Sequence, residues 1–319
     1  MIRMATIGTS SITRTFLDAA SAVDDVDVTT VYSRDADRAA AFASETAIAG
    51  SSDDLDGLLA SSTIDAVYVA SPNGIHAEQA MRAVRAGKHV LLEKPAVPTT
   101  AEFTALVDHA RDHGVVVLEG MRNVHDPALH AIKDLIGSLG PVRRASFSYC
   151  QRSARYDKVL AGERVNIFDP ALAGGALMDL GVYTIAAMVE FFGKPRLVAG
   201  ASVPIAGGAD GAGSALAVYD GLVVDLSYSK ISASQRPDEI QGELGTLTFD
   251  HVAQPTVAQI RLHDGTVTDH SFDGPANNMV HEIRKFAAIV GGTADPTADH
   301  ERTAGVLDVV EMIGQAQVG

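Results

Sequence analysis

The residue with the clearest chemical potential is a lysine at the end of an apolar run. Residues 90–92 are all apolar and read as a buried strand of a parallel sheet, and Glu93-Lys94-Pro95 follows. Because a proline cannot donate to a hydrogen-bond ladder, the strand must end before Pro95. Lys94 is then predicted at the carboxyl end of the strand, where open α/β sheets bind ligands. It could act there as an acid, a base or an anion partner, or be only a surface lysine in a loop.

A second candidate site opens the chain. The apolar run 2–7 predicts a strand, and Gly8-Thr9-Ser10-Ser11-Ile12 leads from it into a helical pattern. A strand, a glycine, small polar residues and a helix form the frame of a phosphate-binding turn. The dinucleotide fingerprint has a second glycine where Ser10 stands, so the match is partial, although the serine hydroxyl could itself bond a phosphate oxygen.

The next predicted strand, 27–32, bears on the choice of cofactor. It ends at Ser33 and Arg34, and Arg38 follows one helical turn later. In a dinucleotide-binding fold this strand end meets the adenosine ribose, where an acidic residue suits NAD and an arginine suits the 2′-phosphate of NADP. A guanidinium fork fits a phosphate dianion well. We therefore predict NADP(H) over NAD(H); the alternative is two solvated arginines at a helix start.

A third turn follows the predicted strand 64–70. Ser71-Pro72-Asn73 has the composition of a turn, and His76 stands at the start of the next helical pattern. His76 either reaches the site or only caps and packs the helix. With 115–118, five apolar runs alternate with helical patterns, which predicts a doubly wound parallel sheet.

The bulk composition narrows the class of protein. The chain has 319 residues, enough for two domains, and 46% of them are hydrophobic. The formal net charge of −15 argues against nucleic acid or an anionic membrane as partner. A single cysteine excludes an intrachain disulfide and cysteine-rich zinc sites, and we expect a cytoplasmic location. We also expect no metal site, no signal peptide and no apolar stretch long enough to span a bilayer.

The second half supplies two more candidate residues. A helix is predicted from Gly174-Gly175 to residue 192, and it carries Asp179 and Tyr183. Four residues apart, these two share one helical face. Alternatively, Asp179 only caps the helix and Tyr183 only packs in the core. The irregular segment 152–170 is a candidate substrate-side loop.

The rest of the second half reads as a sheet closed by helices. Short alternating runs between residues 197 and 270, with turn signals at Asp220-Gly221 and Asp264-Gly265, predict an antiparallel sheet with one face covered by helices. Amphipathic patterns over 277–290 and 300–316 predict the closing helices.

These motifs together resemble the glucose–fructose oxidoreductase / inositol dehydrogenase family, often labelled Gfo/Idh/MocA. The glycine turn, Ser71-Pro72-Asn73 with His76, Glu93-Lys94-Pro95 and the stretch 174–183 occur in the family's order. The motif with Tyr183 is most similar to the dimeric dihydrodiol dehydrogenase-like members. The segment after Glu119 departs from the family's aromatic-Arg-aromatic-His-Pro run.

The resemblance implies an N-terminal Rossmann domain, 1–121, and a C-terminal α+β domain, 122–319, with a large, mostly antiparallel open sheet. It implies an NAD(P)-dependent dehydrogenase or reductase acting on a sugar or related small molecule, a carbonyl or polyol. By position, Lys94, Asp179 and Tyr183 match the catalytic residues, with Lys94 or Tyr183 as the general acid/base and the other as an orienting donor. A homodimer or homotetramer through the C-terminal sheet is expected. The alternatives are a non-catalytic NADP(H)-binding sensor and a nicotinamide-dependent glycoside-cleaving enzyme.

The cofactor-binding positions are expected to be Gly8, Thr9, Ser10, Ser11, Ile12, Ser33, Arg34, Arg38, Ser71, Pro72, Asn73, His76, Glu93 and Lys94.

Overall fold

The chain folds into two compact units in a computed structural model that describes residues 1–315. The first unit joins residues 1–121 to residues 275–304, and the second joins residues 122–274 to the described part of the chain after residue 304. The sequence-based division placed all of 122–319 in the second domain. The structure differs because the segment 275–304 returns to pack in the core of the first unit.

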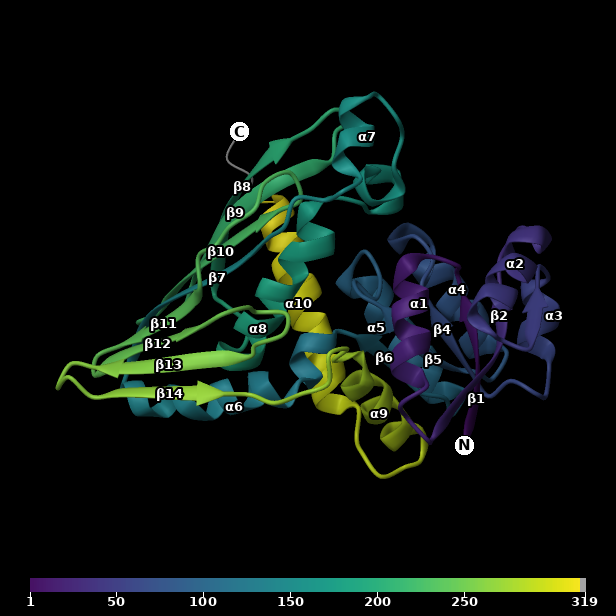
Figure 1. The fold of residues 1–319 in the computed structure, drawn as a ribbon, viewed down its shortest axis with the longest axis horizontal. Helices are drawn as coiled ribbons and strands as arrows, with labels where there is room; N and C mark the ends of the chain where they lie inside the picture. The colour runs from purple at the N-terminus through teal and green to yellow at the C-terminus, as the bar shows by residue number, and fades with distance from the viewer. Residues whose placement is uncertain (316–319) are drawn as a thin grey trace. The chain divides into compact units, whose positions relative to one another are not determined.

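The first unit is a doubly wound parallel sheet with the strand order β3-β2-β1-β4-β5-β6. Figure 1 labels β1, β2, β4, β5 and β6 among the helices of this unit. This confirms the predicted fold class, with six strands in place of five. The strand that the sequence did not reveal, β3, is only three residues of Gly-Ser-Ser, too short and polar for an apolar pattern. The strands are β1 (Ile2–Ile7), β2 (Val26–Tyr32), β3 (Gly50–Ser52), β4 (Ala66–Val69), β5 (His89–Glu93) and β6 (Val117–Gly120).

Helices alternate with these strands, and local signals set where they begin. Thr99 and Glu102 form a capping box, in which Thr99 Oγ1 accepts from the Glu102 amide at 3.2 Å and Glu102 Oε2 accepts from the Thr99 amide at 3.1 Å. The helices of the first unit are α1 (Ser11–Ala20), α2 (Ala36–Thr46), α3 (Leu55–Ala60), α4 (His76–Arg85), α5 (Thr100–Asp112) and α9 (Met279–Val290).

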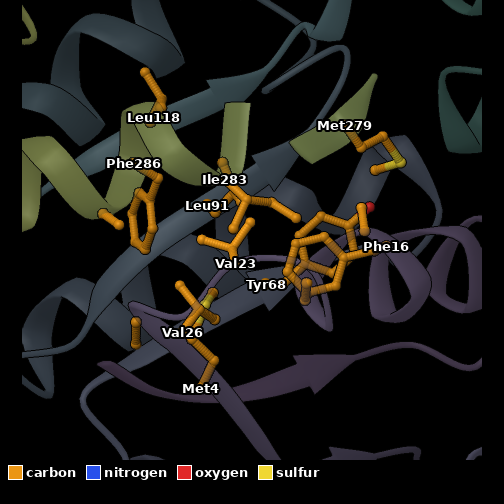
Figure 2. Close-up of a cluster of buried hydrophobic side chains, with 14 of the residues drawn as sticks. Met4, Phe16, Val23, Val26, Tyr68, Leu91, Leu118, Met279, Ile283 and Phe286 are labelled. Atoms are coloured by element: carbon orange, nitrogen blue, oxygen red, sulfur yellow. The ribbon is translucent and has the colours of Figure 1, made fainter. Parts of the chain in front are cut away.

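The core of this unit lies between the sheet, α1 and α9. Phe16 stacks on Tyr68 with ring centroids 3.7 Å apart and planes 8° from parallel. Ile283 and Phe286 of α9 are completely buried in the same cluster, as Figure 2 shows. Burying a side chain of this size stabilises the fold by about 1.5–3 kcal/mol. The late segment is therefore part of the first unit's core.

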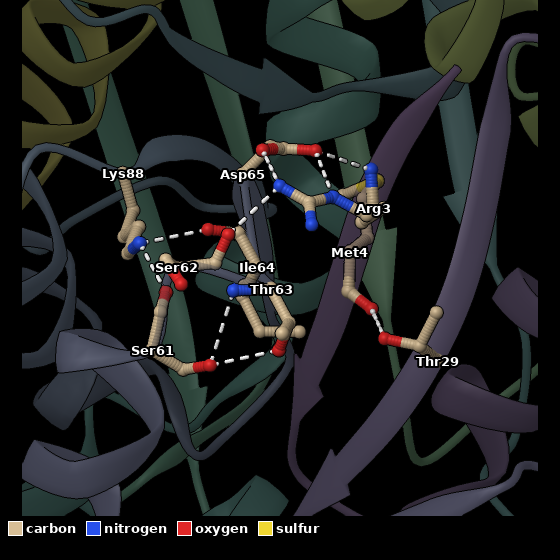
Figure 3. Close-up of polar contacts among 9 residues, drawn as sticks. All are labelled: Arg3, Met4, Thr29, Ser61, Ser62, Thr63, Ile64, Asp65 and Lys88. Carbon is tan, nitrogen blue, oxygen red and sulfur yellow. Dashed lines mark hydrogen bonds and ion pairs between the residues drawn. The ribbon is translucent and has the colours of Figure 1, made fainter.

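Polar contacts join the amino ends of the strands (Figure 3). Arg3 Nη2 lies 2.6 Å from Asp65 Oδ1, and Lys88 Nζ donates to the carbonyls of Ser61 and Ile64 at 2.7 Å each. Both cations thus have partners within the first unit, and their contacts stabilise this end of the sheet. The opposite, carboxyl edge carries Lys94 and the predicted cofactor-binding residues.

The second unit contains an eight-stranded sheet in the order β14-β13-β12-β11-β7-β10-β9-β8. All neighbours pair antiparallel except β7 and β10, which pair in parallel. The mostly antiparallel sheet is confirmed, and both Asp-Gly pairs lie in hairpins with positive-φ glycines. Its strands are β7 (Val142–Cys150), β8 (Leu197–Pro204), β9 (Asp210–Val218), β10 (Val223–Ser229), β11 (Asp238–Gly242), β12 (Gly245–Phe249), β13 (Val257–Leu262) and β14 (Val267–Ser271).

Helix α8 packs against the centre of this sheet, on β7 and β10. By length and composition alone, the stretch 170–192, which includes α8, could cross a membrane, and we did not expect this from the sequence; but 61% of its most apolar 18-residue window is buried inside the protein, the pattern of a core helix. Residue 316, the last residue of the predicted closing helix 300–316, lies outside the described residues. The helices are α6 (Pro127–Leu135), α7 (Tyr156–Leu160), α8 (Val182–Phe192) and α10 (Thr297–Gln315), which begins in the first unit.

Candidate active site

Four loops of the first unit leave the sheet along one edge. In the register of the parallel strands, Ile7 lies opposite both Tyr32 and Val69, and Val69 lies opposite Leu92. The loops that follow these four residues are therefore neighbours. They carry all the predicted cofactor-binding positions, at residues 8–12, 33–38, 71–76 and 93–94.

Gly8 is required by the backbone of its loop. Its φ is +125°, and a Cβ added there would lie 2.6 Å from the carbonyl oxygen of Ala70. The Gly8 amide donates to Tyr32 O at 3.1 Å. Ser10 is the N-cap of α1 with an extended backbone, its side chain makes no capping bond, and the first turn of α1 has no acidic residue. The turn therefore suits an anion such as a pyrophosphate.

The loop after β2 exposes two guanidinium groups. Arg34 and Arg38 are both exposed. Asp35 caps α2 by accepting from the Arg38 amide at 2.9 Å, and Asp37 lies in the first turn of the same helix. Ser33 Oγ accepts from the Asp35 amide at 3.3 Å. The strand end thus presents two exposed guanidinium groups beside the exposed carboxylates of Asp35 and Asp37.

Two of the predicted cofactor-binding residues, His76 and Glu93, are buried and bond to the protein itself. His76 is completely buried, with Nε2 2.8 Å from Ser71 O and Nδ1 3.1 Å from Pro95 O. Burial lowers the pKa of His76, and the Lys94 charge lowers it further. The imidazole therefore ties the loop after β4 to the loop after β5. Both ring nitrogens of His76 lie within hydrogen-bond distance of backbone carbonyls, and its contact with the cofactor stays a prediction.

Glu93 is likewise a support for the loop that carries Lys94. It is 6% exposed, Oε1 accepts from the Tyr68 hydroxyl at 2.6 Å, and Oε2 accepts from the Lys94 amide at 3.1 Å. Just beyond it, Glu119 Oε1 accepts from the Ala96 amide at 2.9 Å, and burial raises the pKa of Glu119. Buried carboxylates thus hold the backbone on both sides of Lys94, which is itself half-buried.

The second unit contains the other two candidate catalytic residues on one helical segment. Asp179 lies in a π-helical turn, Leu177–Gly181, and Tyr183 lies in the first turn of α8. The predicted helix through both residues is confirmed, and its first turn is of the wider π type, which often occurs at functional sites. The side chain of Asp179 is 34% exposed, and Tyr183 is 5% exposed.

Aromatic and cationic groups surround Tyr183. Tyr149 packs edge-on against it at 5.3 Å between ring centroids, and His251 packs edge-on against Tyr149 at 4.7 Å. The Arg122 guanidinium carbon lies 5.6 Å from the centre of the Tyr183 ring. Burial lowers the pKa of His251, and the Arg122 charge adds to that effect. These neighbours fix the orientation of the phenol ring.

Sequence reasoning missed Lys230, the residue that binds Asp179. Its ammonium forms an ion pair with Asp179 Oδ2, and its side chain is only 3% exposed. The available signal was a lysine directly after an alternating strand pattern, the same arrangement that pointed to Lys94. Asp179 and Tyr183 are brought together within one unit, whereas their convergence with Lys94 stays a prediction.

Comparisons with known proteins agree along the whole chain. The oxidoreductase family with an NAD-binding Rossmann fold, GFO_IDH_MocA, matches residues 2–121, and the GFO/IDH/MocA C-terminal domain matches residues 130–248. The chain is 41% identical over 290 residues to scyllo-inositol 2-dehydrogenase (NADP(+)) IolU of Bacillus subtilis, which covers 91% of this chain and 88% of that protein.

Two further relatives show the same relationship. D-xylose 1-dehydrogenase (NADP(+)) 2 of Haloferax volcanii is 30% identical over 290 residues, which cover 89% of this chain and 87% of that protein. The crystal structure of KijD10, a 3-ketoreductase from Actinomadura kijaniata in complex with NADP and TDP-benzene, matches with a TM-score of 0.89 and 27% identity, over 99% of this chain and 98% of that one.

Proposed function

Because the chain belongs to the Gfo/Idh/MocA oxidoreductase family, we propose that it transfers a hydride between NADP(H) and a carbon that bears a hydroxyl or carbonyl group in a sugar or polyol. The observation that carries the proposal is the shared sheet edge, where Lys94 follows β5 and the Gly8 turn follows β1. An acid–base group and a dinucleotide turn at the same edge of one sheet, here separated by the single strand β4, are what such a reaction needs.

The residues present fit NADP(H). The close approach of Gly8 to Ala70 O leaves a backbone turn without a side chain, which a pyrophosphate can approach. Arg34 and Arg38 are exposed at the position that suits a 2′-phosphate. The named NADP-dependent relatives support the same choice.

The roles of this chain's residues follow from their surroundings. The bound nicotinamide would supply or accept the hydride. Lys94 and Tyr183 would contact the reacting oxygen, one as the general acid/base and the other as an orienting donor. The part-exposed carboxylate of Asp179 would accept hydrogen bonds from substrate hydroxyl groups, a common mode of polyol recognition by a charged acceptor.

A fluorescence titration with NADPH and NADH tests the cofactor, and turnover with the better cofactor tests the reaction. We would assay scyllo-inositol and D-xylose first, since the names of two relatives give these compounds as their substrates. Tighter binding of NADPH and turnover of at least one polyol or aldose are expected. Tighter binding of NADH would refute the prediction that Arg34 and Arg38 bind the 2′-phosphate of NADP(H).

Lys94→Met tests the assigned acid–base group. We expect NADPH binding to persist and turnover to fall by at least about 10²-fold, because positioned proton transfer contributes about 10²–10⁴ in rate. Lys133→Met is the matched control, since Lys133 forms a surface pair with Glu190. Near-normal turnover of Lys94→Met would remove Lys94 from the mechanism.

The cytoplasmic location and the assembly through the C-terminal sheet stay predictions. Large apolar side chains on its strands, such as Leu197, Val203 and Val267, are 43–56% exposed. Sedimentation of the purified protein would test the predicted homodimer or homotetramer.

A further inference from the structure

Lys230, which pairs with Asp179, has a backbone that is fixed by the sheet. Lys230 directly follows β10, its amide donates to Gly211 O at 2.8 Å, and its carbonyl accepts from the Ser153 amide at 2.8 Å. Its side chain is 3% exposed. Burying an ammonium without partners costs several kcal/mol, so the surroundings must compensate for the lost hydration.

Two groups provide this compensation. The Lys230 ammonium pairs with Asp179, and it lies 4.9 Å from the centre of the Phe168 ring, within cation–π range. Asp210 supports the same segment: burial raises the pKa of its carboxyl, and hydrogen bonds from backbone amides oppose that effect. Asp210 also accepts from the Leu177 amide at 2.7 Å. It thus ties the start of the π-helical turn to the strand β9.

The pair is asymmetric in a way that points to function. The cation is almost fully buried, whereas its partner carboxylate is one-third exposed. A carboxylate has two oxygens and about four acceptor sites, so its exposed part can accept from ligand hydroxyl groups while an ammonium pairs with it. A buried ion pair contributes little net stability compared with apolar side chains of similar volume. Stability alone therefore does not explain a lysine here.

We propose that Lys230 is a positioning residue, which holds Asp179 ionised and oriented to accept hydrogen bonds from the hydroxyl groups of a polyol or sugar substrate. This inference rests on the proposed function, since it concerns the same site. Lys230 acts through Asp179 and does not itself exchange a proton with the substrate.

A double-mutant cycle on the NADP-loaded enzyme tests the proposal. We would measure kcat/KM, with the polyol or aldose that the wild type turns over, for Lys230→Met, Asp179→Asn and the double variant. Each single change should lower kcat/KM by about 10- to 100-fold, and the double variant should be no worse than Asp179→Asn by more than about threefold, because residues that act as a unit are not additive. A double variant that loses the product of the two single effects would overturn the proposal.

Two further variants separate positioning from folding. Lys88→Met removes another buried lysine, which bonds only to backbone carbonyls of Ser61 and Ile64 among the contacts drawn in Figure 3. It should lower the unfolding temperature and leave kcat/KM within about twofold. Lys230→Arg keeps a cation against Asp179 and should retain at least about tenfold more activity than Lys230→Met. If Lys230→Met does not fold, a folded Lys230→Arg enzyme as inactive as Asp179→Asn would overturn the proposal.

The outcomes distinguish this inference from the proposed function. If the wild type is active, Lys94→Met is not, and the cycle is additive, only the role of Lys230 fails. If the wild type turns over no polyol or sugar with NADP(H), the proposed function fails and the role of Lys230 with it.

Discussion

At the residue scale, the loop after β2 exposes two guanidinium groups, those of Arg34 and Arg38. The carboxylate of Asp35 accepts from the Arg38 amide and so caps α2. An arginine at this strand end suits the 2′-phosphate of NADP, so the exposed guanidinium groups bear directly on cofactor choice.

Arg34→Ala should therefore weaken NADPH binding selectively. A charge-assisted hydrogen bond contributes about 1.5–3 kcal/mol, so we expect the Kd for NADPH to rise by about 10- to 100-fold while the Kd for NADH stays within about twofold. Fluorescence titration measures both. Arg85→Ala, at an exposed arginine in the last turn of α4, is the matched control. An equal loss for both cofactors would show that Arg34 does not read the 2′-phosphate.

The sequence was informative about residues whose role is set by their local backbone. Gly8 and Lys94 are examples, since a strand followed by a turn defines both positions. It was uninformative about residues whose role depends on distant partners. His76 and Glu93 are buried by loops from elsewhere in the first unit, and Lys230 meets Asp179 across 51 positions of sequence.

At the element scale, β11 contains a buried carboxyl that should make stability depend on pH. Asp238 is 1% exposed and Oδ1 accepts from the Ser148 amide at 2.7 Å. Burial raises the pKa of Asp238 to about 8. Between the ordinary carboxyl value of about 4 and this raised pKa, the folded state holds a proton that the unfolded state lacks. The stabilising effect of that proton is complete below the lower value and is lost as the pH rises toward 8.

We therefore expect the free energy of unfolding to be lower at pH 9 than at pH 6, and Asp238→Asn to reduce this difference. Urea unfolding at the two pH values measures it. Asp225→Asn is the control, because Asp225 forms an exposed pair with Arg144 and should leave the pH dependence unchanged. A wild-type protein as stable at pH 9 as at pH 6 would contradict the raised pKa.

Elements of regular pattern were predictable, and irregular ones were not. The alternating run of β7 and the capping box of α5 are read directly from side-chain types. The π-helical turn before α8 has no such signature, because Asp210 of a distant strand holds its first amide.

At the scale of the whole molecule, the first unit needs the end of the chain. Phe286→Ala would empty a completely buried position in the cluster of Figure 2. We expect the free energy of unfolding to fall by about 3–5 kcal/mol, the usual effect of removing a buried phenylalanine. Urea unfolding would measure this loss. Leu160→Ala, at a side chain that is 64% exposed, is the control and should change stability by less than about 0.5 kcal/mol.

This arrangement could not be predicted from the sequence. An amphipathic pattern over 277–290 shows that a helix has an apolar face, but it does not show which core receives that face. The sequence-based division therefore followed chain order, whereas α9 packs with the cluster that contains Phe16 and Tyr68.

The first unit is built from two segments that are far apart in the chain, and this affects how it folds during synthesis. Domains generally fold in the order in which the ribosome delivers them. Here the strands of the first unit are synthesised early, but their core is complete only once α9 and the residues up to Ala304 have also been synthesised. During translation, the nascent sheet thus lacks the apolar cover that α9 provides until the last tenth or so of the chain is being synthesised.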